Sequence, residues 1–389
     1  MRDPVRSALT LLALLAAAAP AVSTASAQQG DASSVTVGTA TAARGATATG
    51  VITVPAGSDS GYAMPVAVIN GVRPGPVVAF VAGSHGTEYT SIVAMQRLIP
   101  RLDAARLTGT VIVVPLVNVA SFLSMTPHLN PVDRKSMNGN YPGDAAGTQT
   151  QRALALLTAD VVDPATVVVD LHGGDLDENL RPYSYWFRGG RAAQDSAGLR
   201  LALAFGLDHV IVTDVDPAAP ATGRSLSGQA LVRGKTVLVA EAGRSGIVAP
   251  ADVDALVDGS LSVLAELGMI ERRAPRVRRC GPSFDCVVQA VGARPARHPV
   301  WLDGAGARLA ADSAGFFFAS VDRDTRVTRG ALLGYTTDFL GRRTGEIRSP
   351  IDGVVSFIRG VPSMWPHATL ASVLPVLEAP RPWRAPAPQ

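Results

Sequence analysis

The chain has 389 residues, of which 47% are hydrophobic, so it is long enough to build one large domain and a smaller one. It carries 35 basic and 32 acidic residues for a net charge of +3, without the interleaving of basic and aromatic residues that is typical of a nucleic-acid-binding surface. The one dense basic run, RRAPRVRR at residues 272–279, is more typical of a solvated linker. We therefore expect no nucleic-acid partner.

The N-terminus has the three parts of a secretory signal peptide. Basic residues open the chain, an apolar stretch fills residues 8–22, and ASA at residues 25–27 offers a cleavage site. The apolar stretch contains Pro20 and is too short to span a membrane. Residues 1–27 are therefore predicted to be a signal peptide, and the mature protein to be secreted or periplasmic with no membrane span. An uncleaved anchor is the alternative.

Residues 28–270 are predicted to form one α/β domain with its core at about 60–270. Weakly alternating residues at 34–54 suggest edge strands, after which apolar runs indicate strands and helically spaced apolar residues indicate helices. The predicted strands are 64–69, 76–82, 109–117, 165–172 and 236–243, and the predicted helices are 91–102, 150–157, 192–205 and 252–267. Several strands are apolar throughout, which is typical of burial on both faces. The pattern predicts a mixed, mostly parallel sheet flanked by helices.

The texture of the sequence changes after residue 270. Residues 271–300 are predicted to be a linker, and residues 301–378 a small all-β barrel or sandwich, because short apolar stretches alternate there with glycines. Residues 379–389 form a proline-rich tail. The chain has two cysteines, Cys280 and Cys286, and in an exported protein we favour a disulfide between them over two free thiols.

Three predicted strands end in residues that can bind a metal. His85 and Glu88 follow the strand at 76–82, His172 ends the strand at 165–172, and Glu241 lies near the end of the strand at 236–243. The carboxyl ends of parallel strands meet at one edge of a sheet, so these side chains can converge. Two histidines and one carboxylate are typical of a catalytic zinc site, and a further carboxylate can accept a proton from water.

Three acidic residues near His172 are open to other interpretations. Asp170 lies on the same side of the strand as His172, where it either orients a metal ligand or solvates the strand end. Asp175 and Glu178 are interpreted as part of a solvated loop rather than of the site.

The chain resembles the succinylglutamate desuccinylase/aspartoacylase family, relatives of the zinc carboxypeptidases. The resemblance covers about residues 60–270 and is carried by the segments PGPVVAFVAGSHGTEYTSI, GTVIVVPLVNVASF, NPVDRKSMNGNYPG, VVVDLHGGDLDENLRPYSYW and GKTVLVAEAG. It implies that His85, Glu88 and His172 hold one zinc ion and that Glu241 is the general base. It also implies a β-rich C-terminal domain.

The resemblance weakens where relatives carry arginines that bind a substrate carboxylate. Asn138 matches the family pattern, but Gly139 and Met125 stand where arginines are expected. A guanidinium makes two parallel hydrogen bonds to a carboxylate, which neither residue can replace. Asn138 and Arg181 are therefore the predicted substrate-binding residues. The alternatives to Arg181 are Arg134, Arg188 and Arg244, and the substrate can also lack a carboxylate.

The sequence thus predicts an exported zinc hydrolase that cleaves the acyl–amide bond of an N-acyl amino acid or a related amide. The alternatives are a zinc carboxypeptidase or cell-wall peptide amidase, and a zinc-containing binding protein with weak catalysis. The expected partner is a small-molecule or peptide amide, and no oligomeric state is predicted.

Overall fold

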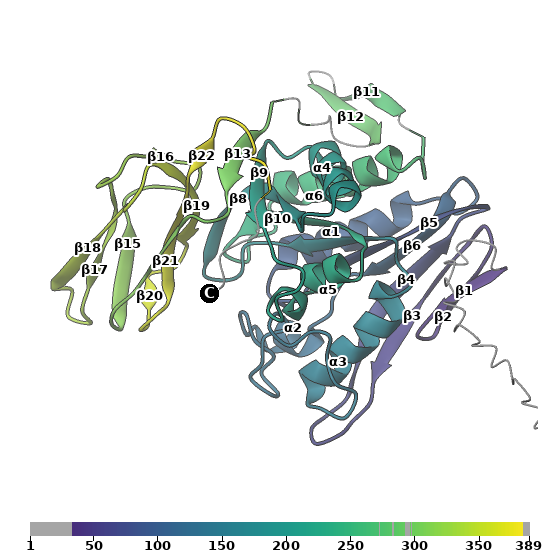
Figure 1. Cartoon of the computed structure of the whole chain (residues 1–389), viewed down its shortest axis with the longest axis horizontal. Coiled ribbons are helices and arrows are strands. Elements are labelled where there is room, and N and C mark those ends of the chain that lie inside the picture. The colour runs from purple at the N-terminus through teal and green to yellow at the C-terminus, as the bar shows by residue number, and fades with distance from the viewer. Residues whose placement is uncertain (1–32, 272, 282–283, 292–295, 297, 384–389) are drawn as a thin grey trace, which may run out of the picture.

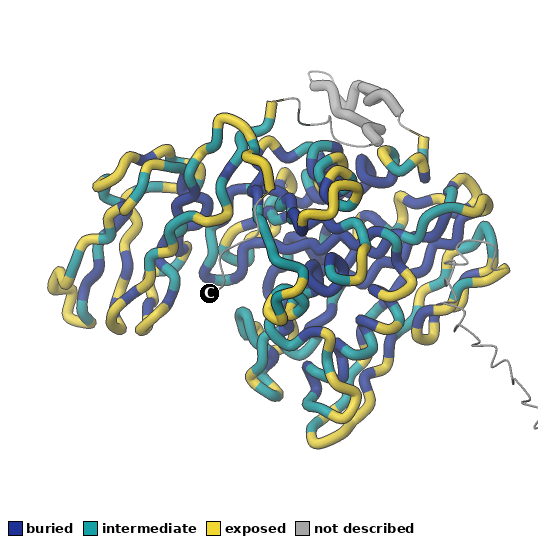
Figure 2. The backbone as a smooth tube through the Cα atoms, in the orientation of Figure 1, coloured by how far each residue is buried: buried dark blue, intermediate teal, exposed yellow. Residues whose placement is uncertain are grey.

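A mixed β-sheet of 14 strands runs through the protein, and helices cover both faces of its part before residue 271 (Figure 1). The computed structural model describes residues 33–271, 273–281, 284–291, 296 and 298–383, and between residues 273 and 291 it describes the backbone alone. Buried backbone is concentrated in the strands of this sheet (Figure 2). The predicted fold, a mostly parallel sheet flanked by helices and followed by an all-β region, is confirmed.

Four parallel strands form the middle of the sheet. In spatial order they are β6 (Thr108–Val114), β5 (Arg73–Ala82), β7 (Val167–His172) and β10 (Thr236–Arg244). They are rich in valine, whose branched side chain suits the pleated backbone. Every residue of β7 is buried, as is every residue of β6 after the first. The carboxyl ends of all four strands lie along one edge.

Further strands extend the sheet on both sides of this parallel core. Beyond β6, antiparallel pairing adds β4 (Tyr62–Asn70) and β3 (Ala46–Val54), beside a separate hairpin of β1 (Ser34–Val37) and β2 (Ala40–Ala43). Beyond β10 the sheet continues with β8 (Glu178–Arg188), which is antiparallel to β10, and with β9 (His209–Asp214), which is parallel to β8.

The helices divide between the two faces of the sheet. One core holds residues of α1 (Tyr89–Leu98), α4 (Ala192–Phe205) and α6 (Pro250–Glu266). The other core holds residues of α3 (Gln149–Leu157) and α5 (Leu226–Val232). The remaining helical segments are α2 (Val119–Ser124), the π-helical turn η2 (Thr158–Val162) and the 3₁₀ turns η1 (Ile99–Arg101) and η3 (Thr222–Arg224). Both faces are therefore closed to water, and the strand ends remain open.

The C-terminal strands form a sandwich that continues the central sheet. The strands that join this sheet are β13 (Val300–Asp303), β14 (Ala307–Ala310), β16 (Arg326–Val327), β19 (Gly353–Arg359), β21 (Thr369–Leu374) and β22 (Val376–Leu377). The facing sheet consists of β15 (Gly315–Ala319), β17 (Leu332–Thr337), β18 (Arg343–Arg348) and β20 (Ser363–Met364). A core that includes Phe317, Leu333 and Val355 joins them. Since β19 pairs directly with β8, backbone hydrogen bonds connect the two regions.

A hairpin occupies most of the segment that the sequence assigned to a linker. Its strands are β11 (Arg273–Gly281) and β12 (Phe284–Val291). The side chains of Cys280 and Cys286 lie outside the described part of the structure, and so does the predicted signal peptide. The disulfide and the cleavage site therefore stay predictions.

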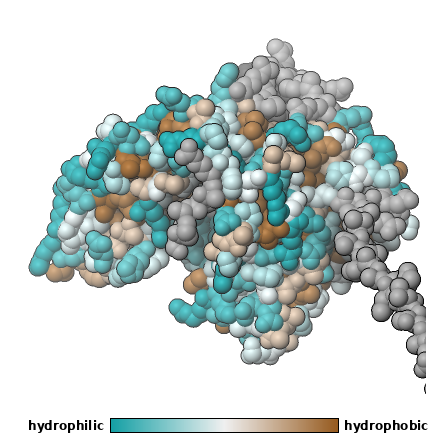
Figure 3. All heavy atoms as spheres, viewed as in Figure 1, coloured by the Kyte–Doolittle hydropathy of each residue, from teal (hydrophilic) through white to brown (hydrophobic). Residues whose placement is uncertain are grey.

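No helix within the described ranges combines the length and the apolar character needed to cross a membrane. On the face seen in Figure 3, hydrophobic areas are small and separated by hydrophilic side chains.

The contact between α4 and α6 generates a test of this packing. Gly259 lies inside α6, and a Cβ atom there would collide with the fully buried ring of Phe205. A Cβ atom at Gly198 in α4 would make only ordinary contacts, the nearest at 3.5 Å. Gly259→Ala should lower the free energy of unfolding by about 1–3 kcal/mol through overpacking. Gly198→Ala should leave it unchanged or raise it by up to about 1 kcal/mol through helix propensity.

Chemical denaturation of the two variants beside the wild-type protein measures this difference. Equal effects of the two substitutions would contradict the close approach of α6 to Phe205.

Candidate metal centre and active site

The predicted site residues lie at the carboxyl edge of the parallel strands. Gly83 directly follows β5 with a φ of 67°, which glycine adopts without strain, so the chain can turn toward His85. Glu88 directly precedes helix α1, and His172 is the last residue of β7. In β10, Glu241 is the register partner of His172. The fold thus brings together side chains from distant parts of the sequence.

The carboxylate of Glu88 lies between two imidazole rings. Its Oε1 is 2.7 Å from His85 Nδ1, and its Oε2 is 3.0 Å from His172 Nδ1. One ligand atom from each of the three residues lies within 4.8 Å of the other two, so a single ion can contact all three. Two histidines and one carboxylate are the ligand set of catalytic zinc sites. The residues present therefore fit zinc.

The charges around Glu88 set its protonation. Burial alone would raise the pKa of Glu88, but the neighbouring His172 and His85 outweigh burial and hold that pKa at about 2. Burial also opposes a charge on His172, yet Asp170 and Glu88 raise the pKa of His172 well above its usual value. This part of the interior therefore carries excess negative charge, which a bound cation would neutralise.

Asp170 orients His172 from behind. Its Oδ1 lies 3.1 Å from His172 Nε2, on the side of the ring away from Glu88. The other ring nitrogen, Nδ1, consequently faces the ligand cluster. Asp170 is 2% exposed, so it does not solvate a strand end, and the geometry favours the orienting role.

Glu241 has the properties of a proton acceptor. The hydroxyl of Tyr183, on the neighbouring strand β8, donates a hydrogen bond of 2.9 Å to Glu241 Oε2. Burial raises the pKa of Glu241, and with the nearby charge of Glu88 the pKa reaches about 7 in spite of His172 and of the hydrogen bond from Tyr183. A carboxylate poised near neutrality can both take up and release a proton.

The three proposed metal ligands, together with Asp170 and Glu241, line a cavity of about 290 Å³. Its wall includes Asn138, which the sequence predicted to bind substrate, and Ser225 and Ser227 near the start of α5. Tyr185 and Phe187 add an aromatic side, with ring centroids 5.6 Å apart and the rings nearly parallel. The cavity is therefore acidic where the ligands meet, with a polar wall and an aromatic wall.

A second acidic group borders the site. Asp175 is fully buried and Glu178 lines the cavity, so the interpretation of these two residues as a solvated loop is wrong. Asp175 accepts hydrogen bonds from Thr87 and from the backbone N–H of His128, and burial raises the pKa of Glu178 to about 8, together with the charge of Glu88. Buried hydrogen bonds, rather than water, satisfy Asp175.

His128 is a site residue that the sequence analysis missed. Its ring centroid lies 5.9 Å from that of His85, and its Nε2 is 2.9 Å from Asp177 Oδ1. Burial opposes protonation of His128, but Asp177 and Asp175 raise its pKa to about 9. Asp177 also pairs at 2.8 Å with Arg359 of the C-terminal region. No signal in the local sequence marks His128, because its partners come from distant segments.

The structure does not bring Arg181 to the cavity. Arg181 is 8% exposed, and its guanidinium pairs with Asp208 at 3.0 Å and with Asp324 at 2.7 Å. It is not among the residues that line the cavity around the ligands. Arg181 therefore ties β8 to the C-terminal region, because Asp324 lies in that region.

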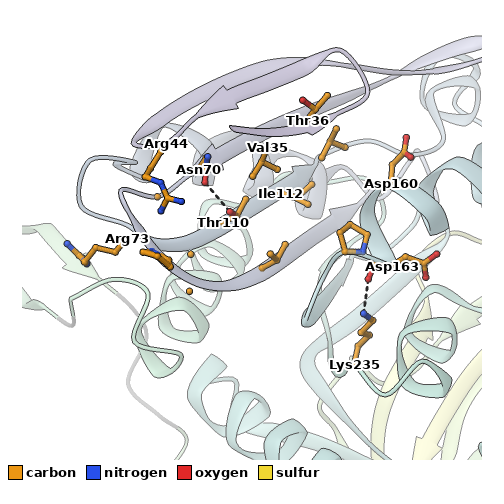
Figure 4. Close-up of a pocket in the computed structure, with 17 residues that line it drawn as sticks. Val35, Thr36, Arg44, Asn70, Arg73, Thr110, Ile112, Asp160, Asp163 and Lys235 are labelled. Carbon is orange, nitrogen blue, oxygen red and sulfur yellow. Dashed lines mark hydrogen bonds between the residues drawn. The ribbon is translucent and has the colours of Figure 1, made fainter. Parts of the chain in front are cut away.

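A larger cavity, of about 350 Å³, lies at the opposite end of the parallel strands (Figure 4). Its cationic side chains are already engaged: Lys235 donates to the carbonyl of Asp163 at 2.8 Å, and Arg73 donates to Thr108 at 2.9 Å. It contains none of the predicted ligands. We therefore assign the chemistry to the carboxyl edge.

Comparisons with known proteins agree with this geometry. Residues 74–267 match the succinylglutamate desuccinylase/aspartoacylase catalytic domain. The chain is 26% identical over 314 residues to the N-alpha-acetyl-L-2,4-diaminobutyric acid deacetylase of Halomonas elongata, with 78% of this chain and 84% of that protein covered.

Solved structures show the same architecture. The crystal structure of a succinylglutamate desuccinylase/aspartoacylase from Rhodobacter sphaeroides matches with a TM-score of 0.71 and 25% identity, covering 86% of this chain and 96% of that one. The product-bound structure of the ectoine utilization protein EutE (DoeB) from Ruegeria pomeroyi matches with a TM-score of 0.71 and 20% identity, covering 85% and 95%. With the catalytic-domain match, these similarities show that the protein belongs to the succinylglutamate desuccinylase/aspartoacylase family.

Proposed function

We propose that the protein is a zinc-dependent hydrolase that removes the acyl group from an N-acyl amino acid or a related amide. The observation that carries the proposal is the three-residue ligand set of His85, Glu88 and His172 with a separate carboxylate, Glu241, in the adjacent strand. The relative from Halomonas elongata is a deacetylase of an N-acetylated amino acid, which supports the same bond type.

The proposed metal is held by His85, Glu88 and His172. When bound, zinc acts as a Lewis acid that polarises the substrate carbonyl and makes water more acidic. Asp170 fixes the orientation of His172, with 3.1 Å between Oδ1 and Nε2. The charges of His172 and His85 hold the pKa of Glu88 at about 2 in spite of its burial, so Glu88 is ionised near neutral pH, as a zinc ligand must be.

Glu241 is assigned to proton transfer. It accepts a proton from the attacking water and passes it to the nitrogen of the leaving amine. The hydroxyl of Tyr183 donates a hydrogen bond of 2.9 Å to the carboxylate of Glu241, which holds this carboxylate in one orientation. The partly buried rings of Tyr185 and Phe187 line one side of the cavity and limit the access of bulk water to the reacting groups there.

Export is part of the proposal. The basic start, the apolar stretch and the small residues ASA at positions 25–27 support a signal peptide that is removed after Ala27. Mature protein from an exporting host should begin at Gln28, as measured by intact mass spectrometry. Secreted material that retains residues 1–27 would show that the N-terminus is an anchor instead.

The ligand set predicts about one zinc ion per chain. His85→Ala and His172→Ala should each release the metal and lower the melting temperature, because the carboxylates left behind are buried without a cation. Elemental analysis and thermal unfolding measure the two effects. His298→Ala, which changes an exposed histidine, is the matched control and should keep the metal. A metal-free protein with full activity would contradict the ligand assignment.

Glu241→Gln separates proton transfer from metal binding. The amide keeps the shape of the side chain but cannot accept the proton, so kcat should fall by about a hundred- to ten-thousand-fold. Zinc content should remain that of the wild type, and KM should change little, because the loss is confined to the transition state. The measurement is steady-state hydrolysis of N-acetyl and N-succinyl amino acids.

Glu346→Gln, the same substitution at an exposed position of β18, is the control for Glu241→Gln and should be neutral. Loss of zinc from Glu241→Gln would make Glu241 a metal ligand and would refute its assignment as the base.

A further inference from the structure

A second cavity, of about 320 Å³, borders the cavity at the metal ligands. The two cavities share Glu178, Tyr185 and Glu241 in their walls. The far wall of the second cavity is built by the C-terminal strands and contains Arg308, Ser356, Thr369 and Ser372. A substrate whose amide bond lies at Glu241 therefore has room to extend toward the C-terminal region.

Arg308 is the only arginine or lysine among the described residues that line these two cavities. The walls near the ligands carry four carboxylates instead, those of Glu88, Asp170, Glu178 and Glu241. An anionic group of a substrate is therefore attracted to the distal end of the second cavity, where Arg308 lies. The acidic residues thus lie near the metal ligands, and the basic residue lies at the distal end of the second cavity.

Arg308 is an exposed residue of β14 whose guanidinium is held by one hydrogen bond and has no acidic partner among the described residues. Its Nε donates a hydrogen bond of 2.7 Å to Thr369 Oγ1, which fixes the side chain against the neighbouring strand. Within the described ranges, no carboxylate pairs with Arg308, and its two terminal nitrogens make no hydrogen bond. Arg323, Arg348 and Arg359, of the same region, each have an acidic partner. An arginine held in this way can form two parallel bonds to a carboxylate.

The distance between the two ends sets the size of the substrate. Glu241 and Arg308 lie on strands separated by four steps in one sheet, through β8, β19 and β21. At about 4.8 Å per step, the two strands are roughly 19 Å apart along the sheet. Side chains from both ends shorten the gap, and an extended chain covers about 3.3–3.6 Å per residue. An acetylated single amino acid is too short to reach both ends, whereas a chain of a few residues fits.

We propose that Arg308 binds a carboxylate at the far end of an extended substrate whose acyl–amide bond lies at Glu241. This inference rests on the proposed function and names its substrate class: N-acyl compounds with a chain of about two to four residues in length that ends in a carboxylate. The carboxylate is either the C-terminus of a short N-acyl peptide or the distal acid of a long dicarboxylic acyl group. Ser356 and Ser372 provide polar groups along the way.

The first experiment compares N-acetyl-dialanine and N-acetyl-trialanine with their C-terminal amides on the zinc-loaded protein. The wild type should prefer the acids by roughly tenfold or more in kcat/KM, since a charge-assisted bidentate pair is lost in the amides. Arg308→Gln should remove this preference by raising KM for the acids while leaving the amides unchanged. Arg308→Lys, which keeps the charge but not the fork, should restore it in part. N-adipoyl-alaninamide, whose only carboxylate is on the acyl group, tests the second source of the carboxylate, the distal acid of a dicarboxylic acyl group.

Arg326→Gln is the matched control, because Arg326 is exposed in the same region and does not line the cavity. An equal effect of Arg308→Gln on acids and amides, or no effect on either, would overturn the role of Arg308.

A binding measurement keeps this inference separate from the proposed hydrolysis. Calorimetric titration of the Glu241→Gln protein with N-acetyl-trialanine and with N-adipoyl-alaninamide reports affinity without turnover. Adding Arg308→Gln should weaken the binding of the carboxylate compound by roughly tenfold and leave N-acetyl-trialaninamide unaffected. If the wild type hydrolyses none of the compounds but this difference appears, the proposed function fails and the Arg308 subsite stands. If the wild type hydrolyses the compounds but Arg308→Gln causes no such difference in binding, the proposed function stands and the Arg308 subsite fails.

Discussion

The buried carboxylate of Glu88, fixed between the imidazoles of His85 and His172, is the interaction on which the rest of the site depends. A carboxylate with this little exposure is stable only beside positive charge, and Asp170 adds further negative charge behind His172. Glu241 and Glu178 show the opposite shift: burial and the negative charge of Glu88 raise their pKa values. One group of carboxylates thereby provides an ionised ligand and a residue that can exchange a proton.

The sequence predicted the parts of the fold that single strands encode by themselves. β6, β7 and β10 are continuous apolar runs, so their burial on both faces was readable, and the residues at their ends followed from the geometry of a parallel sheet. Strand β8 was not predicted, because Pro182 and several charged residues interrupt its alternation. Its pairing with β10 and β19 overrides that local signal.

The side chains whose roles were not readable are those with partners from distant segments. Arg181 was predicted at the substrate, but Asp208 and Asp324 pair with it elsewhere. His128 has no local signature, since Asp175 and Asp177 lie more than forty residues away in the chain. Arg308 belongs to a region whose composition predicted only a small β domain, and its relation to the cavity depends on the order of strands in the sheet. The local sequence pattern does not show which distant residues pair with these side chains.

The hydrogen bonds between β19 and β8 have a consequence for how the protein is made. Strand β8, which provides Tyr183, is complete when residue 188 has been synthesised, but its partner β19 begins only at residue 353. Until then, the edge of β8 at Leu180 has unpaired backbone groups, which invite pairing with another chain. Ribosome-bound or truncated chains that end before β19 therefore expose an unpaired strand edge beside the site, which can pair with another chain and cause aggregation.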